Sequence, residues 1–286
     1  KHNQLKIIDS GHDRFVFKRQ IDKSSLKPPF AFDYLFSDHL PILLKIDNMP
    51  KELSDLAGCE NACATSDAYK LGPLIQDLSA AFDRTCQLKI VNTGTISKYY
   101  PRWGKHEMTY LGHKYSCPIV DKGKFLSLFR KSYGQKSIQP KIIIKGLNLL
   151  DACLDSDGSI IPGKSTLIVA GTDIRKLKFV LSIINSRLTF FYLRERYPAS
   201  SYNLGTNFTK EMINNLPLPL LNDEQKKPFI SLVDNILTIT TSGDYYENKE
   251  KQASVKGLER QIDQMVYELY GLTPEEIAVV EGTSKK

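Results

Sequence analysis

The chain has 286 residues, of which 41% are hydrophobic and 25% charged, the composition of an ordinary soluble globular protein of about two domains. Its apolar runs end well before the roughly 18 positions that a membrane-spanning helix needs, so the sequence predicts no membrane contact. The net charge is +7, but residues 89–210 hold 20 Lys and Arg against 7 Asp and Glu. This net charge of +13 indicates a polyanionic partner, and a solvated basic face without a ligand is the alternative.

Five cysteines are scattered along the chain, and their odd number favours free thiols in a reducing cytoplasm over a set of disulfides. Cys59 and Cys63 approach a metal-binding spacing, but no second Cys or His pair completes a tetrahedral site, so no metal is expected. The sequence starts at Lys1 without a charged and then apolar leader, which we interpret as a fragment lacking a secretory signal.

Residues 1–45 are predicted to be a connecting segment. Arg14–Arg19 favours a short strand, and Pro28, Pro29 and Pro41 interrupt the rest of the segment.

Residues 46–221 are predicted to form an α+β domain, a mixed β-sheet with flanking helices. β-branched runs predict its strands, and one apolar face predicts a short helix at Lys124–Tyr133. The predicted strands are Leu88–Asn92, Ile142–Lys145 and Thr166–Ala170.

A long helix is predicted from Asp173, a good N-cap residue, until Pro198 ends it. This helix would carry Arg194 and Arg196 to its C-terminal end. There they either meet an anionic ligand or simply complement the helix dipole.

Residues 222–286 are predicted to be helical and to pack against the preceding domain. One helix is expected to restart at Pro228, a second runs through Leu258–Leu269 and ends at Gly271, and a third opens at Thr273 with a capping box.

The stretch Gly158–Ser165 formally matches the phosphate-loop pattern G-x-x-x-x-G-K-[ST]. A phosphate loop requires a helix after it, whereas a strand is predicted here, and Pro162 removes a backbone amide. A hairpin-like connection is therefore expected, with Lys164 facing the polyanionic partner.

Two segments interleave basic, aromatic and amide side chains, which suits clamping of a nucleic-acid backbone and stacking on bases. The first runs from Asn92 to Tyr115, where Trp103 is either a core anchor or a stacking group. The second runs from Arg194 to Lys210, where the alternative is a tight loop whose Thr209 caps the next helix.

Several ordered blocks of the chain resemble the C-terminal specificity region of TaqI-like adenine-N6 DNA methyltransferases, including restriction-modification fusion enzymes. These blocks are N-T-G-T-I at 92–96, Y-L-G-H-K-Y at 110–115, R-E-R-Y-P-A-S at 194–200, T-N-F-T-K at 206–210 and N-L-P-L-P at 215–219. Residues 53–70 and 261–272 resemble the opening and the terminal helix of the same regions. The resemblance implies that residues 46–221 are a target-recognition domain.

The resemblance further implies that this chain reads double-stranded DNA for an upstream methyltransferase domain of the same polypeptide. S-adenosylmethionine is implied for that parent enzyme, with no cofactor in this chain. The catalytic Asn-Pro-Pro-Tyr tetrapeptide and the glycine-rich cofactor loop are absent from the sequence, so we expect no activity of its own. Whether the parent also cuts DNA stays open.

We predict that DNA contacts come from basic residues at phosphates and from amides at base edges. The predicted contact residues are Thr93, Arg102, Lys105, Lys114, Lys145, Lys164, Arg194, Arg196, Tyr202, Asn203, Asn207 and Lys210. The alternative is a protein-interaction module, in which the C-terminal helices dock on a partner methyltransferase through Leu258, Ile262 or Val266.

Overall fold

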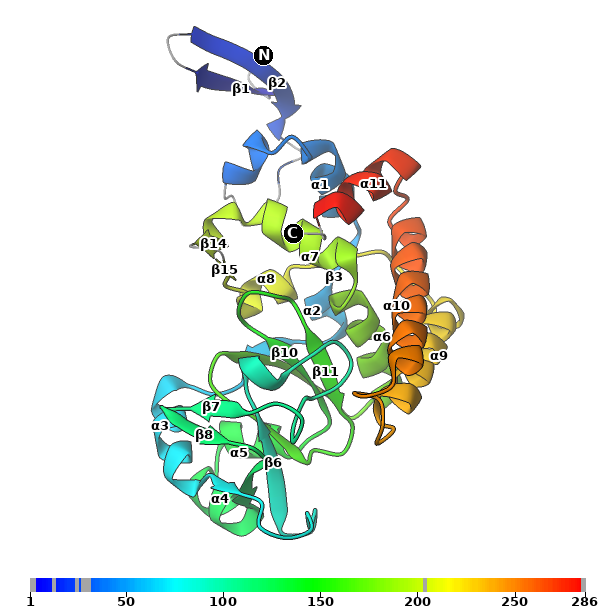
Figure 1. Cartoon of the computed structure of the whole chain (residues 1–286). Helices are drawn as coiled ribbons and strands as arrows, with labels where there is room; N and C mark the ends of the chain where they lie inside the picture. Colours follow the sequence, from blue (N-terminus) through cyan, green and yellow to red (C-terminus); the bar gives the residue numbers. More distant parts are fainter. Residues whose placement is uncertain (1–3, 12–13, 24–25, 27–31, 203–204, 284–286) are drawn as a thin grey trace.

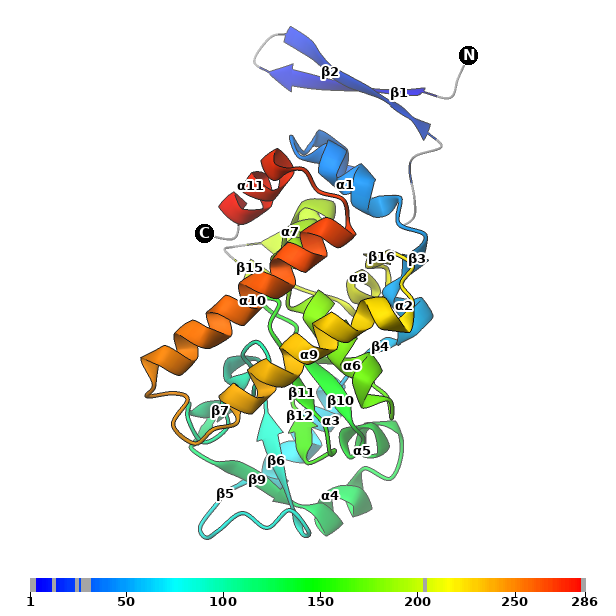
Figure 2. The same ribbon diagram turned by 90° about the vertical axis from the view of Figure 1, so that its right-hand side faces the viewer.

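The computed structural model describes residues 4–11, 14–23, 26, 32–202 and 205–283. It is a mixed α+β fold, as predicted, with several small sheets and a C-terminal set of helices. A β-hairpin of β1 (Gln4–Gly11) and β2 (Arg14–Asp22) projects from one end of the molecule (Figures 1 and 2). The strand expected at Arg14–Arg19 is therefore confirmed.

A four-stranded antiparallel sheet lies at the centre of the fold, in the order β11-β10-β13-β4. Two of these strands were predicted, because β-branched runs suit a strand buried on both faces. The bounds are β4 (Cys59–Asn61), β10 (Lys141–Lys145), β11 (Ala152–Asp155) and β13 (Thr166–Ala170).

Asparagine side chains close both edges of this central sheet. On β11, the Asn185 amide accepts from the Ala152 N–H at 2.9 Å and donates to the Ala152 carbonyl at 3.0 Å. On β4, the Asn214 amide makes the same two bonds with the backbone of Cys59, at 2.7 and 2.9 Å. Each amide thus satisfies backbone groups at an outer edge of the sheet, and on β11 the Tyr99 N–H also donates to the Ala152 carbonyl, at 2.7 Å.

A second sheet has the order β12-β6-β9-β5, and its β6–β12 pair is parallel, with Val91 opposite Pro162. Short helices and the β7–β8 hairpin surround it in the lower part of Figure 1. The bounds are α3 (Thr65–Leu71), η3 (Gly72–Leu74), β5 (Gln76–Asp77), β6 (Gln87–Val91), η4 (Thr93–Thr95), β7 (Met108–Tyr110), β8 (His113–Tyr115), β9 (Pro118–Asp121), α4 (Lys122–Leu128), α5 (Ser132–Ser137) and β12 (Ile160–Pro162).

The long helix predicted from Asp173 to Pro198 is two helices, α6 (Ile174–Ile184) and α7 (Arg187–Arg196). The Asp173 carboxylate caps α6 as expected, by accepting from the Lys176 N–H. The break arises because Asn185 binds the sheet edge, while the Ser186 hydroxyl accepts from the Thr189 N–H and starts a new helix. Apolar periodicity alone did not reveal this interruption.

Two other predicted helices differ from the structure. The one expected at Lys124–Tyr133 is divided into α4 and α5. The helix expected to restart at Pro228 already begins at Asp223, where Asn222 caps it by accepting from the Gln225 N–H at 2.9 Å. A proline in an early turn removes only one helical hydrogen bond, so the cap determines the start.

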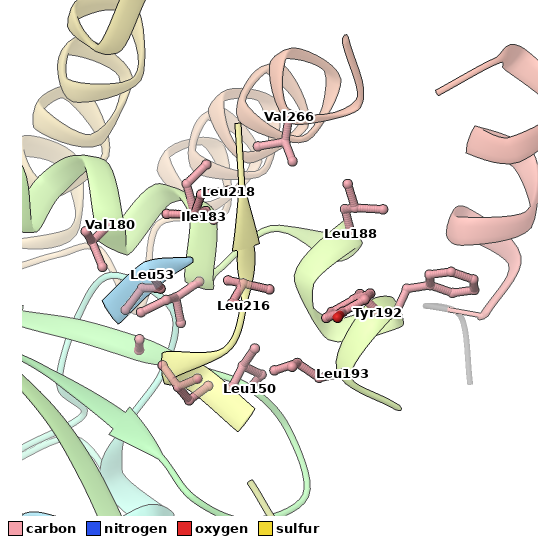
Figure 3. Close-up of a cluster of buried hydrophobic side chains, with 14 of the residues drawn as sticks. Leu53, Leu150, Val180, Ile183, Leu188, Tyr192, Leu193, Leu216, Leu218 and Val266 are labelled. Carbon is pink, nitrogen blue, oxygen red and sulfur yellow. The ribbon is translucent and has the colours of Figure 1, made fainter. Parts of the chain in front are cut away.

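The largest hydrophobic core lies between the central sheet and the helices of the upper part. Figure 3 shows Leu53, Leu150, Val180, Leu193 and Leu216 meeting in it from elements far apart in the chain. α9 packs along α6, and α10 along α9 and α7. The remaining bounds are η2 (Asp33–Phe36), α1 (Leu40–Asp47), β3 (Lys51–Glu52), α2 (Leu53–Leu56), η5 (Pro198–Ser200), β14 (Ser201–Tyr202), β15 (Gly205–Thr206), α8 (Lys210–Asn214), β16 (Pro217–Leu218), α9 (Asp223–Thr240), α10 (Lys249–Leu269) and α11 (Pro274–Thr283).

Buried residues from all three predicted segments share this core, including Tyr34 and Leu43 from the segment expected to be a connection. The boundaries at 45/46 and 221/222 remain predictions. Among the described residues, no helix has the length and apolar character needed to span a membrane.

The connection Gly158–Ser165 contains β12 and leads directly into β13, so it is followed by a strand, as predicted. Before it, the Asp155 carboxylate forms a buried ion pair with the Lys141 ammonium. That ammonium also donates to the Ser137 carbonyl at 2.6 Å. Burial raises the pKa of Asp155 and lowers the pKa of Lys141.

Candidate functional site

A cleft of about 600 Å³ is lined by residues of α3, of α8 and of the connection that precedes α8. Figure 1 shows α3 and α8 in the left half of the molecule. Five segments that are distant in the sequence line this cleft. They are the β4–α3 connection with the start of α3 (61–67), the start of α5 (132–133), the start of the β10–β11 loop (Gly146), the β12–β13 connection with the start of β13 (165–167) and the β15–α8 connection with the start of α8 (207–211).

Backbone hydrogen bonds hold these segments together at the end of the central sheet. The Gly146 N–H donates to the Ser165 carbonyl at 3.1 Å, and the Phe208 N–H donates to the Gly146 carbonyl at 2.9 Å. A Cβ atom at Gly146 would lie 2.6 Å from the Ser165 oxygen, so only glycine allows this approach. β4 joins the same corner because Asn61 pairs with Leu167 of β13.

The cleft presents both donors and acceptors of hydrogen bonds. Asn61 and Asn207 contribute exposed amides, and Thr65 contributes an exposed hydroxyl. Asp67 and Glu211 contribute carboxylates, which only accept when ionised. Amide, hydroxyl and carboxylate groups are the types that read base edges in nucleic acids.

Two ionisable groups of the cleft have pKa values that differ from the ordinary ones. A hydrogen bond from its own backbone N–H holds the pKa of Glu211 below the ordinary value, so this carboxylate is charged at neutral pH. Burial raises the pKa of the Cys63 thiol to about 11, which keeps it neutral. Among the described residues, no cluster of His, Cys, Asp and Glu has a metal-binding arrangement.

Three predicted contact residues come together at this cleft. Asn207 lines it directly. Lys164 is exposed beside Ser165, and its charge acts on the Cys63 thiol inside the cleft. Lys210 begins α8 between Thr209 and Glu211, both of which line the cleft.

Thr93 and Lys114 extend this surface toward the β7–β8 hairpin. β6 and β12 are parallel and end together, and the Gly163 N–H donates to the Val91 carbonyl at 2.7 Å. Thr93, which follows β6, therefore leaves the sheet beside Lys164, which follows β12. Between Val91 and Thr93, the Asn92 amide donates to the Thr109 carbonyl of β7 at 2.8 Å. Lys114 lies opposite Thr109 on β8 and pairs with Glu107 at 3.0 Å.

Arg102 and Lys105 face a different neighbour, the connection between α9 and α10. The Lys105 ammonium lies 3.4 Å from the Glu247 carboxylate and 5.8 Å from the Tyr246 ring centroid. Arg102 lies beside the same tyrosine. Burial raises the pKa of Tyr246, and Arg102 opposes this by lowering it to a smaller extent. Both residues contact the C-terminal helical segment and do not line the cleft.

Trp103 packs partly buried against the small core formed by β6, β10 and β13. Its indole N–H donates to the Pro118 carbonyl at 2.7 Å, and the Lys89 ammonium lies 4.7 Å from its ring centroid. In this conformation the side chain is therefore an anchor of the fold.

Lys145 and Arg194 are half-buried next to the site. The Lys145 ammonium lies 3.9 Å from the Asp151 carboxylate, and the Arg194 guanidinium lies 5.4 Å from the Phe190 ring centroid.

The prediction that Arg196 contacts DNA is corrected by the structure, because this residue is only 1% exposed. Its guanidinium stacks 3.8 Å from the centroid of the Tyr34 ring, and its Nε lies 3.3 Å from the Asp47 carboxylate. Tyr192 donates to that carboxylate at 2.6 Å. Arg196 thus fixes α7 to the segment of η2 and α1.

Asn203 lies outside the described residues. Tyr202 ends β14, whose backbone pairs with β15. The Thr209 hydroxyl caps α8 by accepting from the Met212 N–H at 3.3 Å, as the alternative for this segment predicted.

Sequence reasoning missed Asn61, Thr65, Asp67 and Glu211 as members of the site. The segment 64–70 resembles the start of target-recognition domains, and that signal could have indicated Thr65 and Asp67. No local signal marked Asn61 or Glu211. The pairing of β4 with β13 brings Asn61 to the cleft, and the packing of α8 against β4 brings Glu211 there.

No family model matches the chain, and no curated protein does. Among solved structures, the chain is similar to part of the type IIL restriction-modification enzyme MmeI, which was solved in complex with DNA. The TM-score is 0.48 at 10% identity, over 82% of this chain and 36% of that enzyme. It is also similar to part of the type IIG restriction endonuclease BpuSI, with a TM-score of 0.45 at 12% identity, over 96% of this chain and 41% of that enzyme. The chain thus spans less than half the length of either restriction-modification enzyme.

Proposed function

We propose that this chain recognises a short sequence in double-stranded DNA through the cleft between α3 and α8. The observation that carries the proposal is the lining of that cleft, in which Asn61, Thr65, Asp67, Asn207 and Glu211 offer base-reading groups side by side. The flanking Lys164 and Lys210 supply the positive charge that phosphates require.

The basic middle of the chain supports this proposal more weakly than its net charge of +13 suggests. Lys141 and Arg196 are buried in ion pairs, so they add nothing to the field at the surface. Lys164 is exposed, and the Lys210 ammonium lies 3.8 Å from its sequence neighbour Glu211.

The resemblance of the sequence to adenine-N6 methyltransferases supports the further proposal that methylation is carried out by another domain of the same polypeptide. We expect S-adenosylmethionine, its cofactor, to be bound by that other domain. The glycine-containing stretch Gly158–Ser165 runs from strand to strand and offers no helix N-terminus to a ligand.

The protein-interaction alternative loses its main support in the structure. Ile262 and Val266, which were expected to face a partner, are buried within this chain, and α10 packs against α7 and α9. Leu258 also packs partly buried against the same core.

The proposal is tested by enrichment from a pool of randomised duplexes, followed by salt titration of the enriched duplex. We expect convergence on one short sequence, and we expect log affinity to fall with log salt by about 0.9 for each phosphate contacted. The double variant Lys164→Ala, Lys210→Ala should bind at least roughly tenfold more weakly, because each charge-assisted bond contributes about 1.5–3 kcal/mol. Its salt dependence should be shallower by about 0.9 for each lysine removed.

The matched control is Lys249→Ala with Lys256→Ala, which removes two exposed lysines from α10. This variant should keep the affinity and the salt dependence of the wild type. Absence of enrichment, or equal losses in the two variants, would contradict recognition through this cleft.

A further inference from the structure

The β10–β11 loop places two exposed leucines at the rim of the cleft. Leu147 is 38% exposed and Leu149 is 52% exposed, and they flank Asn148. Gly146, the residue just before them, lines the cleft itself. Apolar side chains of this size are usually buried, so two of them beside a polar cleft require an explanation.

The loop backbone is strained at its tip. The Leu149 N–H donates to the Leu147 carbonyl at 3.0 Å across Asn148, whose φ of 68° is left-handed. A three-residue turn with a positive φ at its centre is rare and strained, although asparagine tolerates such a φ better than most residues. Strain of this kind tends to occur where the conformation serves a function.

Neighbouring segments fix this strained tip in place. The Asn148 N–H donates to the Thr206 carbonyl at 2.8 Å, and Leu147 forms a β-bridge with Asn207. Because the Gly146 backbone bonds on both sides to Ser165 and Phe208, the loop is part of the same framework as the cleft. The two leucines are therefore held outward next to Asn207, a base-reading candidate.

We propose that Leu147 and Leu149 form a wedge that enters the base stack of duplex DNA bound at the cleft. The inference rests on the proposed function and adds to it a way of deforming the ligand. Rigid apolar side chains next to polar base-reading groups are the arrangement by which proteins unstack a base step and kink or unwind a duplex. Stacked bases would also bury the apolar surface that the leucines now expose to water.

The experiment uses a singly nicked plasmid that DNA ligase seals in the presence of the protein. Insertion between base steps unwinds the duplex, so circles sealed with wild-type protein should have a lower linking number after the protein is removed. The variant Leu147→Ser, Leu149→Ser should still shift the plasmid in a gel but should lose most of the linking-number change. Both side chains are exposed, so circular dichroism should show an unchanged fold.

The matched control is Leu128→Ser with Leu220→Ser, which changes leucines that are 47% and 71% exposed and do not line the cleft. It should unwind the plasmid as the wild type does. Binding without any change in linking number, or an equal change with the serine variant, would overturn the wedge while leaving DNA recognition intact. Failure of the wild type to bind plasmid or enriched duplex would instead overturn the proposed function, and the wedge with it.

Discussion

Two groups of basic residues in the middle of the chain have opposite environments. Lys141 and Arg196 are buried and paired with Asp155 and Asp47, whereas Lys164 stands exposed at the rim of the cleft. Both groups contribute to the net charge of the segment, yet only the second is accessible to a ligand. The number of basic residues in a segment therefore includes those that the fold pairs with buried carboxylates as well as those that a ligand can contact.

Substitutions of the buried and the exposed basic residues should change stability by different amounts. The largest loss is expected at Lys141. In Lys141→Met, Asp155 remains buried without its cation, and the free energy of unfolding should fall by about 3–5 kcal/mol. Urea denaturation measures the loss. The variant Lys164→Met serves as the control and should lie within about 0.5 kcal/mol of the wild type, because this side chain is exposed. Equal losses of unfolding free energy at the two positions would contradict the distinction between a structural Lys141 and an exposed Lys164.

A slightly smaller effect is expected at Arg196. Arg196→Met should lower the free energy of unfolding by about 3 kcal/mol, because Asp47 loses its buried cation but keeps the hydrogen bond from Tyr192. Arg194→Met, two positions earlier in α7, should cost less than about 1 kcal/mol, since Arg194 is half-buried and lies over a phenylalanine ring. Urea denaturation again gives both values. If Arg194→Met were the more destabilising change, the assignment of Arg196 as the structural residue would be wrong.

The smallest effect is expected at Glu259 of α10, which lies in a cavity with Lys98, Arg187 and Asp263. Burial raises the pKa of Glu259 above its ordinary value of 4.5, against the opposing effect of Lys98. The folded state therefore holds this proton more tightly, and the contribution of Glu259 to stability falls as the pH rises from about 4.5 through the folded pKa.

Glu259→Gln cannot titrate, so its Tm should exceed that of the wild type at pH 8, and the difference should vanish near pH 4.5. Thermal melts across this pH range measure the change. A Tm difference that grows on acidification would show that the cations around Glu259 outweigh its burial.

Local features of the fold were predictable because they depend on neighbours in the sequence. The strand at Thr166–Ala170 and the caps at Asp173, Thr209 and Thr273 follow from side-chain type and spacing. The break at Asn185 was not predictable, because its cause is the backbone of Ala152, which lies elsewhere in the chain.

The candidate site was predictable only in part for the same reason. Asn207 and Lys164 were proposed from their residue types, whereas Asn61 reaches the cleft through strand pairing between distant segments. Arg196 was misassigned because its partner Asp47 lies 149 positions earlier, and no local pattern reveals such a pairing.

The two asparagines that close the central sheet have a consequence for how the protein behaves in concentrated solution. An uncovered strand edge is a template on which other chains can pair and aggregate, and natural proteins cover or interrupt such edges. Here an amide on each outer strand, Asn185 at Ala152 and Asn214 at Cys59, occupies backbone groups that a foreign strand could otherwise use. On β11, the backbone of Tyr99 covers the same edge through a bridge to Cys153. Two side chains, from α8 and the end of α6, thus help to keep further strands from adding to the four-stranded sheet.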